Sequence, residues 1–173
     1  MEPIELLIFI LPTYVANAAP VVLRGKTPID MGQKMKDKNR IFGENKTIKG
    51  FLFAIAAGTI VSALTALLLP QVFSQLSFNE KIALGFLLSL GAMLGDLIGS
   101  FVKRRIGMQS GQESPIMDKI LFAITALIVA YPIYNGKIAL GILDATIILI
   151  LTYFLHIVFN RIAHAAKLKK VPW

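Results

Sequence analysis

Five long apolar runs constrain this chain more than any other feature of its sequence. They cover residues 4–23, 50–70, 82–102, 116–134 and 138–159. Each approaches the roughly 20 residues that an α-helix needs to cross about 30 Å of hydrocarbon. Apolar residues make up 55% of the 173 residues and charged residues only 16%, a balance typical of membrane proteins. We therefore predict an all-α, polytopic integral membrane protein with five transmembrane helices in a single domain, residues 1–173.

Lysine and arginine are distributed unevenly between the connections. Residues 24–49 hold eight of the eighteen, residues 103–119 hold four, and the tail after Phe159 holds four. Because cytoplasmic segments of membrane proteins are enriched in these residues, we predict a multi-pass protein of the cell membrane with its N-terminus outside. The loops 24–49 and 103–117 and a basic tail, 160–173, are then cytoplasmic. This topology explains the formal charge of +8, and no motif supports nucleic-acid binding.

Asp96 is an ionisable residue near the end of the third apolar run. Asp96, Ser100 and Lys103 are spaced i, i+4 and i+7, so they share one face of a helix. A row of small residues runs beside them: Gly91, Gly95 and Gly99. Such a row lets another helix pack closely, and an interhelical hydrogen bond at that contact is the simpler interpretation of Asp96 taken alone.

Asp118 gives Asp96 a possible partner. Ser114 followed by Pro115 predicts the start of the fourth helix, with Ser114 as its N-cap. Asp118 then lies one turn into that helix, at a depth similar to that of Asp96. Two such carboxylates suit Mg²⁺, which usually keeps waters and bridges to phosphate oxygens. We predict that Asp96 and Asp118 are metal ligands, within reach of the phosphate-binding cations Lys103 and Arg104.

The first loop ends in a second candidate anion site. The segment "GENKTIKG", residues 43–50, runs directly into the second apolar run. Lys46 and Thr47 are therefore expected near a helix N-terminus, where backbone N–H groups and the helix dipole favour anions. The "GKT" at residues 25–27 is not a nucleotide-binding P-loop, because the earlier glycine of that motif is replaced by Pro20. The chain has no cysteine, which excludes thiolate chemistry.

Two of these segments resemble a known family. "GDLIGSFVKRRIG", residues 95–107, and "SPIMDK", residues 114–119, resemble the signature region of the integral-membrane CTP:phosphatidate cytidylyltransferases. The matching residues are Gly95, Asp96, Ser100, Lys103, Arg104, Asp118 and Lys119. "NKTIKGF", residues 45–51, resembles a further segment of that family. The bacterial and eukaryotic members are longer and carry a glycine- and histidine-rich run where this chain has "QSGQESPIM". Its short length and its "ANAAP", "PID" and "RIFGENKT" elements look closer to the archaeal branch, the CDP-archaeol synthases.

The resemblance implies a membrane cytidylyltransferase of phospholipid biosynthesis. Such an enzyme transfers CMP from CTP to an unsaturated archaeal ether-lipid phosphate in the bilayer and releases pyrophosphate, with Mg²⁺ as cofactor. It implies an active site at the cytoplasmic loops. Asp96 and Asp118 would hold the metal, and Lys103 and Arg104 would contact the triphosphate. Seven further residues are expected to bind the nucleotide or to order its site: Lys46, Thr47, Asn45, Ser100, Arg40, Asp37 and Asp30.

Other functions are open to a chain of this composition. A small ion or metabolite transporter could use Asp96 and Asp118 as an ion path, and a noncatalytic membrane scaffold would need no paired acids. A CDP-alcohol phosphotransferase would also work with Mg²⁺ and a membrane lipid, but its D-G-x-x-A-R aspartate cluster is missing from the sequence.

Overall fold

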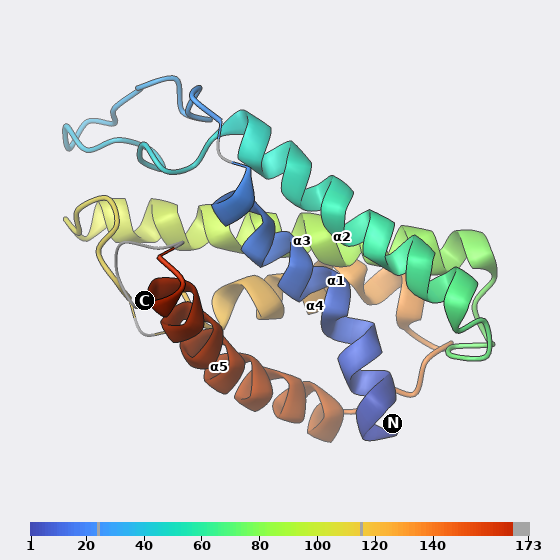
Figure 1. Cartoon of the computed structure of the whole chain (residues 1–173). Helices are drawn as coiled ribbons and strands as arrows, with labels where there is room; N and C mark the ends of the chain where they lie inside the picture. The colour runs from blue at the N-terminus through green and yellow to red at the C-terminus, as the bar shows by residue number, and fades with distance from the viewer. Residues whose placement is uncertain (24, 115, 168–173) are drawn as a thin grey trace.

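The computed structural model describes residues 1–23, 25–114 and 116–167, and these form an all-helical bundle (Figure 1). The helices, in chain order, are α1 (Pro3–Val22), α2 (Ile48–Leu68), α3 (Phe78–Arg105), α4 (Leu121–Tyr134) and α5 (Ile142–Ala165). Four of them, α1, α2, α3 and α5, are long and apolar enough to cross a membrane, and α4 is a shorter apolar helix of 14 residues. The all-α membrane fold predicted from the apolar runs is confirmed.

The fourth helix begins later than its sequence predicts. Regular helix starts at Leu121, whereas residues 116–120 form turns, with the Ile120 N–H donating to the Ile116 carbonyl at 3.0 Å. An N-cap side chain would accept a hydrogen bond from the following backbone, but here the Ser114 backbone N–H donates to the side chain of Asp118, at 2.8 Å from Oδ2. Ser114 is therefore not the N-cap, and Pro115 lies outside the described residues. Asp118 precedes α4 and holds the chain in a turn.

The glycine row on α3 is the contact surface for α4, as predicted. A Cβ atom added at Gly91 would lie 2.6 Å from Ala126 Cα, and one at Gly95 would lie 2.7 Å from Phe122 Cα. These are closer approaches than any side chain allows. The facing residues on α4 include Phe122 and Ala126, which are both buried. Because lipid provides no hydrophobic driving force between helices, close packing of small residues is what holds such a pair together.

The fifth helix is attached more loosely than the other four. Of its described residues only Ile148 and Thr152 are buried, and the Thr152 hydroxyl is 2.9 Å from the Tyr14 hydroxyl of α1. In Figure 1 α5 runs along one side of the bundle, apart from α2 and α3. The helix begins at Ile142, where Asp144 Oδ2 accepts the Gly141 N–H at 2.9 Å. It continues to Ala165, so the first part of the predicted basic tail is helical, and residues 168–173 lie outside the described part.

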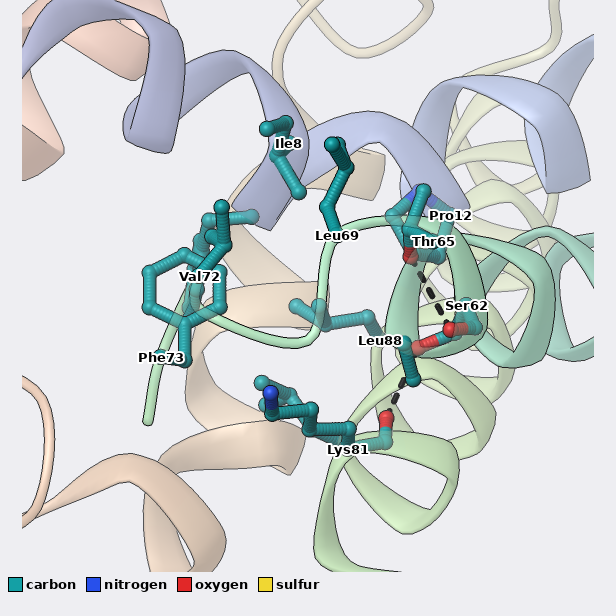
Figure 2. A pocket seen from close by; sticks show the side chains of 12 residues that line it. Ile8, Pro12, Ser62, Thr65, Leu69, Val72, Phe73, Lys81 and Leu88 are labelled. Atoms are coloured by element: carbon teal, nitrogen blue, oxygen red, sulfur yellow. Dashed lines mark hydrogen bonds between the residues drawn. The ribbon is translucent and has the colours of Figure 1, made fainter. Parts of the chain in front are cut away.

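The two ends of the bundle differ in character. The connections 23–47 and 106–120 lie at one end, and the α2–α3 and α4–α5 connections lie at the other (Figure 1). At this second end, Lys81 Nζ donates to the Pro70 carbonyl at 2.7 Å. The Ser62 hydroxyl donates to the Lys81 carbonyl (Figure 2). The adjoining cavity has a volume of about 20 Å³, which is enough for a single water. The lysine-rich connections thus share one end of the molecule, and the small cavity at the opposite end is not a substrate site.

Candidate functional site

The candidate site is built on one face of α3, close to its C-terminal end. Ser100, Lys103 and Arg104 are buried there, with exposures of 4%, 8% and 6%. Asp96 lies on the same face, and its side chain is 27% exposed. Burying two cations costs free energy unless anions compensate them. The partners of these residues therefore define what the site can bind.

Asp96 is paired with Lys46 from the end of the first connection. Lys46 Nζ lies 2.6 Å from both carboxylate oxygens. A cavity of about 40 Å³ adjoins the pair, and apolar residues of α1, α2 and α3 contribute to its walls, among them Pro20, Phe51 and Met93. Lys46 thus reaches the α3 face from the first connection, and the local charge of Asp96 is neutralised.

Asp118 is paired with the other lysine of the site. Its Oδ1 accepts a hydrogen bond from Lys103 Nζ, and its Oδ2 accepts the Ser114 N–H. Lys103 also donates to the carbonyl of Gln112, at 3.3 Å. The connection 106–120 therefore folds back over the end of α3 and brings Asp118 to the same helix as Asp96.

The two carboxylates reach α3 at different levels. Lys103, the partner of Asp118, lies seven residues beyond Asp96, which is about 10 Å along a helix. Asp118 does not line the cavity beside Asp96. The described residues contain no group of three or more His, Cys, Asp or Glu side chains that could hold a metal ion. An all-protein metal cage is therefore not built into the described part, and shared ligation of one ion by Asp96 and Asp118 stays a prediction.

Arg104 has no such carboxylate bonded to it. Its Nε is buried and lacks a hydrogen-bond partner among the described residues. Gly43 from the first connection covers the guanidinium, since a Cβ atom at Gly43 would lie 3.9 Å from Arg104 Nη1 and 3.2 Å from the Ser110 hydroxyl. The backbone of Gly43 has φ +103°, a conformation that side chains disfavour. A buried donor without a partner is costly, and Arg105 Nε is in the same state.

Thr47 lies where the sequence predicts, but its hydroxyl is already engaged. It is the N-cap of α2, and its Oγ1 accepts the N–H groups of Gly25 and Gly50, both at 3.2 Å. The side chain is buried. Thr47 therefore fixes the start of α2 and the chain before it, and it places Lys46 next to Asp96.

The first connection is folded rather than a loose solvated loop. Arg40 pairs with the buried carboxylate of Asp30, and Arg105 of α3 donates to Asp37 at 2.9 Å and to the Arg40 carbonyl at 2.6 Å. Asn45 Nδ2 lies 3.4 Å from the Ser110 hydroxyl of the second connection. Arg40 and Asp37, which we expected at the nucleotide, make these ordering contacts.

Two residues of the site were not identified from the sequence. Gly43 lies beside both Ser110 and Arg104, yet Gly43 and Ser110 are in polar stretches where glycine and serine are common. A glycine that adopts positive φ can be suspected from its position before a helix. The contact of Gly43 with Arg104, 61 positions further along the chain, cannot be recognised from a single sequence.

These features define a class of protein: a polytopic membrane protein with a buried cationic site, neutralised in part by two aspartates, at one end of its bundle. The chain belongs to the CarS-like CDP-archaeol synthase family, whose profile matches residues 3–173. It is 45% identical over 174 residues to the CDP-archaeol synthase of Pyrococcus abyssi, and the match covers all of both chains. The CDP-archaeol synthase of Sulfolobus acidocaldarius is 36% identical, with 96% of each chain covered.

A solved structure has the same fold. It is described as that of an intramembrane enzyme for archaeal membrane lipids biosynthesis, and its TM-score with this chain is 0.78. The two sequences are 34% identical, and the match covers 89% of this chain and 91% of the other. The family resemblance in the two signature segments therefore extends over nearly the whole molecule.

Proposed function

We propose that this protein transfers CMP from CTP to an archaeal ether-lipid phosphate, forming a CDP-activated lipid and pyrophosphate. The observation that carries this proposal is the buried, cation-rich face of α3, where Arg104 Nε lacks a hydrogen-bond partner among the described residues, in a chain that matches the CDP-archaeol synthases along its full length. A triphosphate supplies the anions that such a face lacks. Membrane-length helices explain why a nucleotide-using enzyme would hold a lipid substrate.

The reaction needs positioning and neutralisation of charge more than proton transfer. An anionic oxygen of the lipid phosphate attacks the α-phosphorus of CTP, and the bond between that phosphorus and the bridging oxygen of the β-phosphate breaks. Pyrophosphate leaves with the bonding electrons. Because the attacking oxygen is already ionised, no side chain has to remove a proton. Catalysis then depends on fixed charges near the phosphates, and we assign this role to Lys103, Arg104 and Lys46.

The lysines and aspartates of the site are proposed to exchange partners when CTP binds. Lys46 and Lys103 neutralise Asp96 and Asp118 in the present structure. Both aspartates are partly exposed, at 27% each, and carboxylate oxygens are ligands that Mg²⁺ accepts together with water and phosphate oxygens. Either carboxylate could therefore serve as a ligand for magnesium, which would neutralise developing charge on the phosphates. The lysines released from the aspartates would then bind phosphate oxygens.

We further propose that this end of the bundle faces the cytoplasm. Sixteen of the eighteen lysine and arginine residues lie in the segments 24–49, 103–119 and 160–173, which is the distribution expected for a cytoplasmic side. CTP then enters from the cytoplasm, and the lipid reaches the site from the bilayer. Ser100 and Asn45 are candidates for contacts with the nucleotide.

A transporter is a weaker interpretation of the same residues. An ion path needs polar groups through the depth of the membrane. Between Lys81 and Asp96, α3 has no ionisable side chain, a distance of about 20 Å along the helix. The charged groups of α3 are therefore separated into two end clusters instead of forming a path.

The function is tested by following both substrates. Purified protein in detergent is given labelled CTP, Mg²⁺ and a geranylgeranylated glycerol phosphate. We expect equal amounts of CDP-lipid and pyrophosphate, with no product when either substrate is omitted. Hydrolysis of CTP without a lipid product, or ion flux in vesicles without turnover, would contradict the proposal.

A further inference from the structure

Asp30 organises the first connection from a buried position. Its side chain is 4% exposed. Oδ1 accepts hydrogen bonds from the Gly32 N–H and from Arg40 Nη2, and Oδ2 accepts from Arg40 Nε, the Phe42 N–H and the Gly43 N–H. Two carboxylate oxygens offer about four lone-pair sites. All of that capacity is used inside the connection, so Asp30 is not available as a ligand for a metal or a nucleotide.

The hydrogen bonds around Asp30 connect it to two of the three cations of the site, Arg104 and Lys46. At one side, the Gly43 N–H donates to Asp30 Oδ2 at 3.0 Å, and Gly43 is the residue that covers Arg104. At the other side, the neighbouring Ile29 N–H donates to the Lys46 carbonyl at 2.8 Å. A shift of the Asp30 carboxylate would therefore move the cover of Arg104 and the backbone of Lys46 together.

The charge of Asp30 is well stabilised. Burial by itself would raise the pKa of its carboxyl, but the Arg40 guanidinium and the N–H groups of Gly43, Phe42 and Gly32 outweigh that effect and hold the pKa far below its usual value. A carboxylate that accepts several N–H bonds is stabilised in its charged form in this way. The connection therefore keeps its arrangement throughout the neutral range.

We infer that Asp30 is a positioning residue for the nucleotide: it touches no substrate, and it sets Lys46 and Arg104 for the triphosphate. This inference rests on the proposed function, in which those two cations bind CTP. It predicts an effect on KM for CTP that a general stabilising role would not produce, because the hydrogen bonds of the Asp30 side chain stay within the first connection.

Asp30→Asn is the informative variant, because an amide nitrogen would donate where the carboxylate accepts. Glu44→Gln is the matched control, since Glu44 is exposed and also pairs with Arg40, at 3.6 Å. We expect Asp30→Asn to raise KM for CTP about tenfold or more, with KM for the lipid phosphate within about twofold of the wild-type value. Glu44→Gln should leave both constants unchanged.

Each outcome decides the inference. If kcat falls in proportion to the folded fraction while KM for CTP stays constant, Asp30 is merely structural and the inference is wrong. Should Asp30→Asn fail to fold, Gly43→Ala disturbs the same link through its positive φ and must raise KM for CTP alone; an unchanged KM there overturns the inference. Wild-type protein without any CTP-dependent product would instead refute the proposed function, so the two failures are distinguishable.

Discussion

Replacing Gly95 by alanine should separate α3 from α4 and reduce the rate of turnover. The new Cβ would lie 2.7 Å from Phe122 Cα and 2.9 Å from the Leu121 carbonyl oxygen, and both are backbone atoms that cannot rotate away. Ordinary contact begins near 3.4 Å, so α4 has to retreat by about 0.7 Å, at a cost of about 1–3 kcal/mol in stability for overpacking.

The same displacement acts on the site, because Asp118 precedes α4 by three residues. Moving the start of α4 shifts Asp118 relative to Lys103, and displacements near 1 Å can cost about 100-fold in rate. We therefore expect kcat per folded molecule to fall about tenfold in Gly95→Ala. This loss is smaller than about 100-fold because the expected displacement of α4 is smaller than 1 Å. The assay measures CDP-lipid formation, normalised to the monodisperse protein in detergent.

Two further glycines provide controls for this prediction. At Gly99 the nearest atoms to an added Cβ are 3.4 Å and 3.5 Å away, so Gly99→Ala should behave as wild type. At Gly58 the Pro12 carbonyl would be 2.6 Å away, in a contact that does not involve α4, so Gly58→Ala should lower stability without changing kcat per folded molecule. The reasoning is refuted if Gly95→Ala has a normal kcat, or if Gly99→Ala is impaired to the same extent.

Three other predictions concern the connections at the charged end. The cavity beside Asp96 has a volume of about 40 Å³, far less than the roughly 300 Å³ or more of a small-molecule site, so the two connections must separate to admit CTP. In this cysteine-free chain, a disulfide between Asn45→Cys and Ser110→Cys should hold the connections together and abolish turnover until it is reduced. Activity in the oxidised protein would contradict this opening. Thr47→Val removes the acceptor for two N–H groups and should lower the free energy of unfolding by about 1–2 kcal/mol, while Thr47→Ser should not. Equal melting temperatures for Thr47→Val and Thr47→Ser would count against the capping role. The folded-state pKa of Asp30 lies below its usual 3.8, so the stabilisation by its carboxylate is complete above pH 3.8 and is lost as the pH falls through the folded-state pKa. The difference in melting temperature between wild type and Asp30→Asn should therefore be constant from about pH 5 to 8 and become smaller only under more acidic conditions. A difference that disappears near pH 6 would be inconsistent with this.

The features that follow local periodicity could be predicted from the sequence. Apolar runs of membrane length locate the helices, and the spacing of Gly91, Gly95 and Gly99 predicts a close helix contact, because both depend on residues a few positions apart. The asymmetric distribution of lysine and arginine likewise placed the two polar connections at one end. The position of Lys46 before α2 followed from the same kind of local pattern.

The partners of the charged residues could not be predicted in this way. Lys46 binds a carboxylate 50 positions away, and Arg105 binds one 68 positions away, so both depend on the path of the connections. The start of α4 was predicted too early because Ser114 and Pro115 form a typical helix start, while the Asp118 side chain stabilises a turn there instead. The hydrogen bond from the Ser114 N–H to the Asp118 carboxylate therefore stabilises a turn where the local sequence predicts the start of a helix.

The central claim is that Asp96 and Asp118 act together on one nucleotide at the charged end of the bundle. Its most direct test is the rate of CDP-lipid formation by Asp96→Asn and Asp118→Asn, compared with Asp144→Asn, whose carboxylate caps α5. We predict that each of the first two loses about 100-fold or more in kcat while remaining folded, and that Asp144→Asn keeps its rate per folded molecule. Wild-type turnover by either Asp96→Asn or Asp118→Asn would contradict the claim.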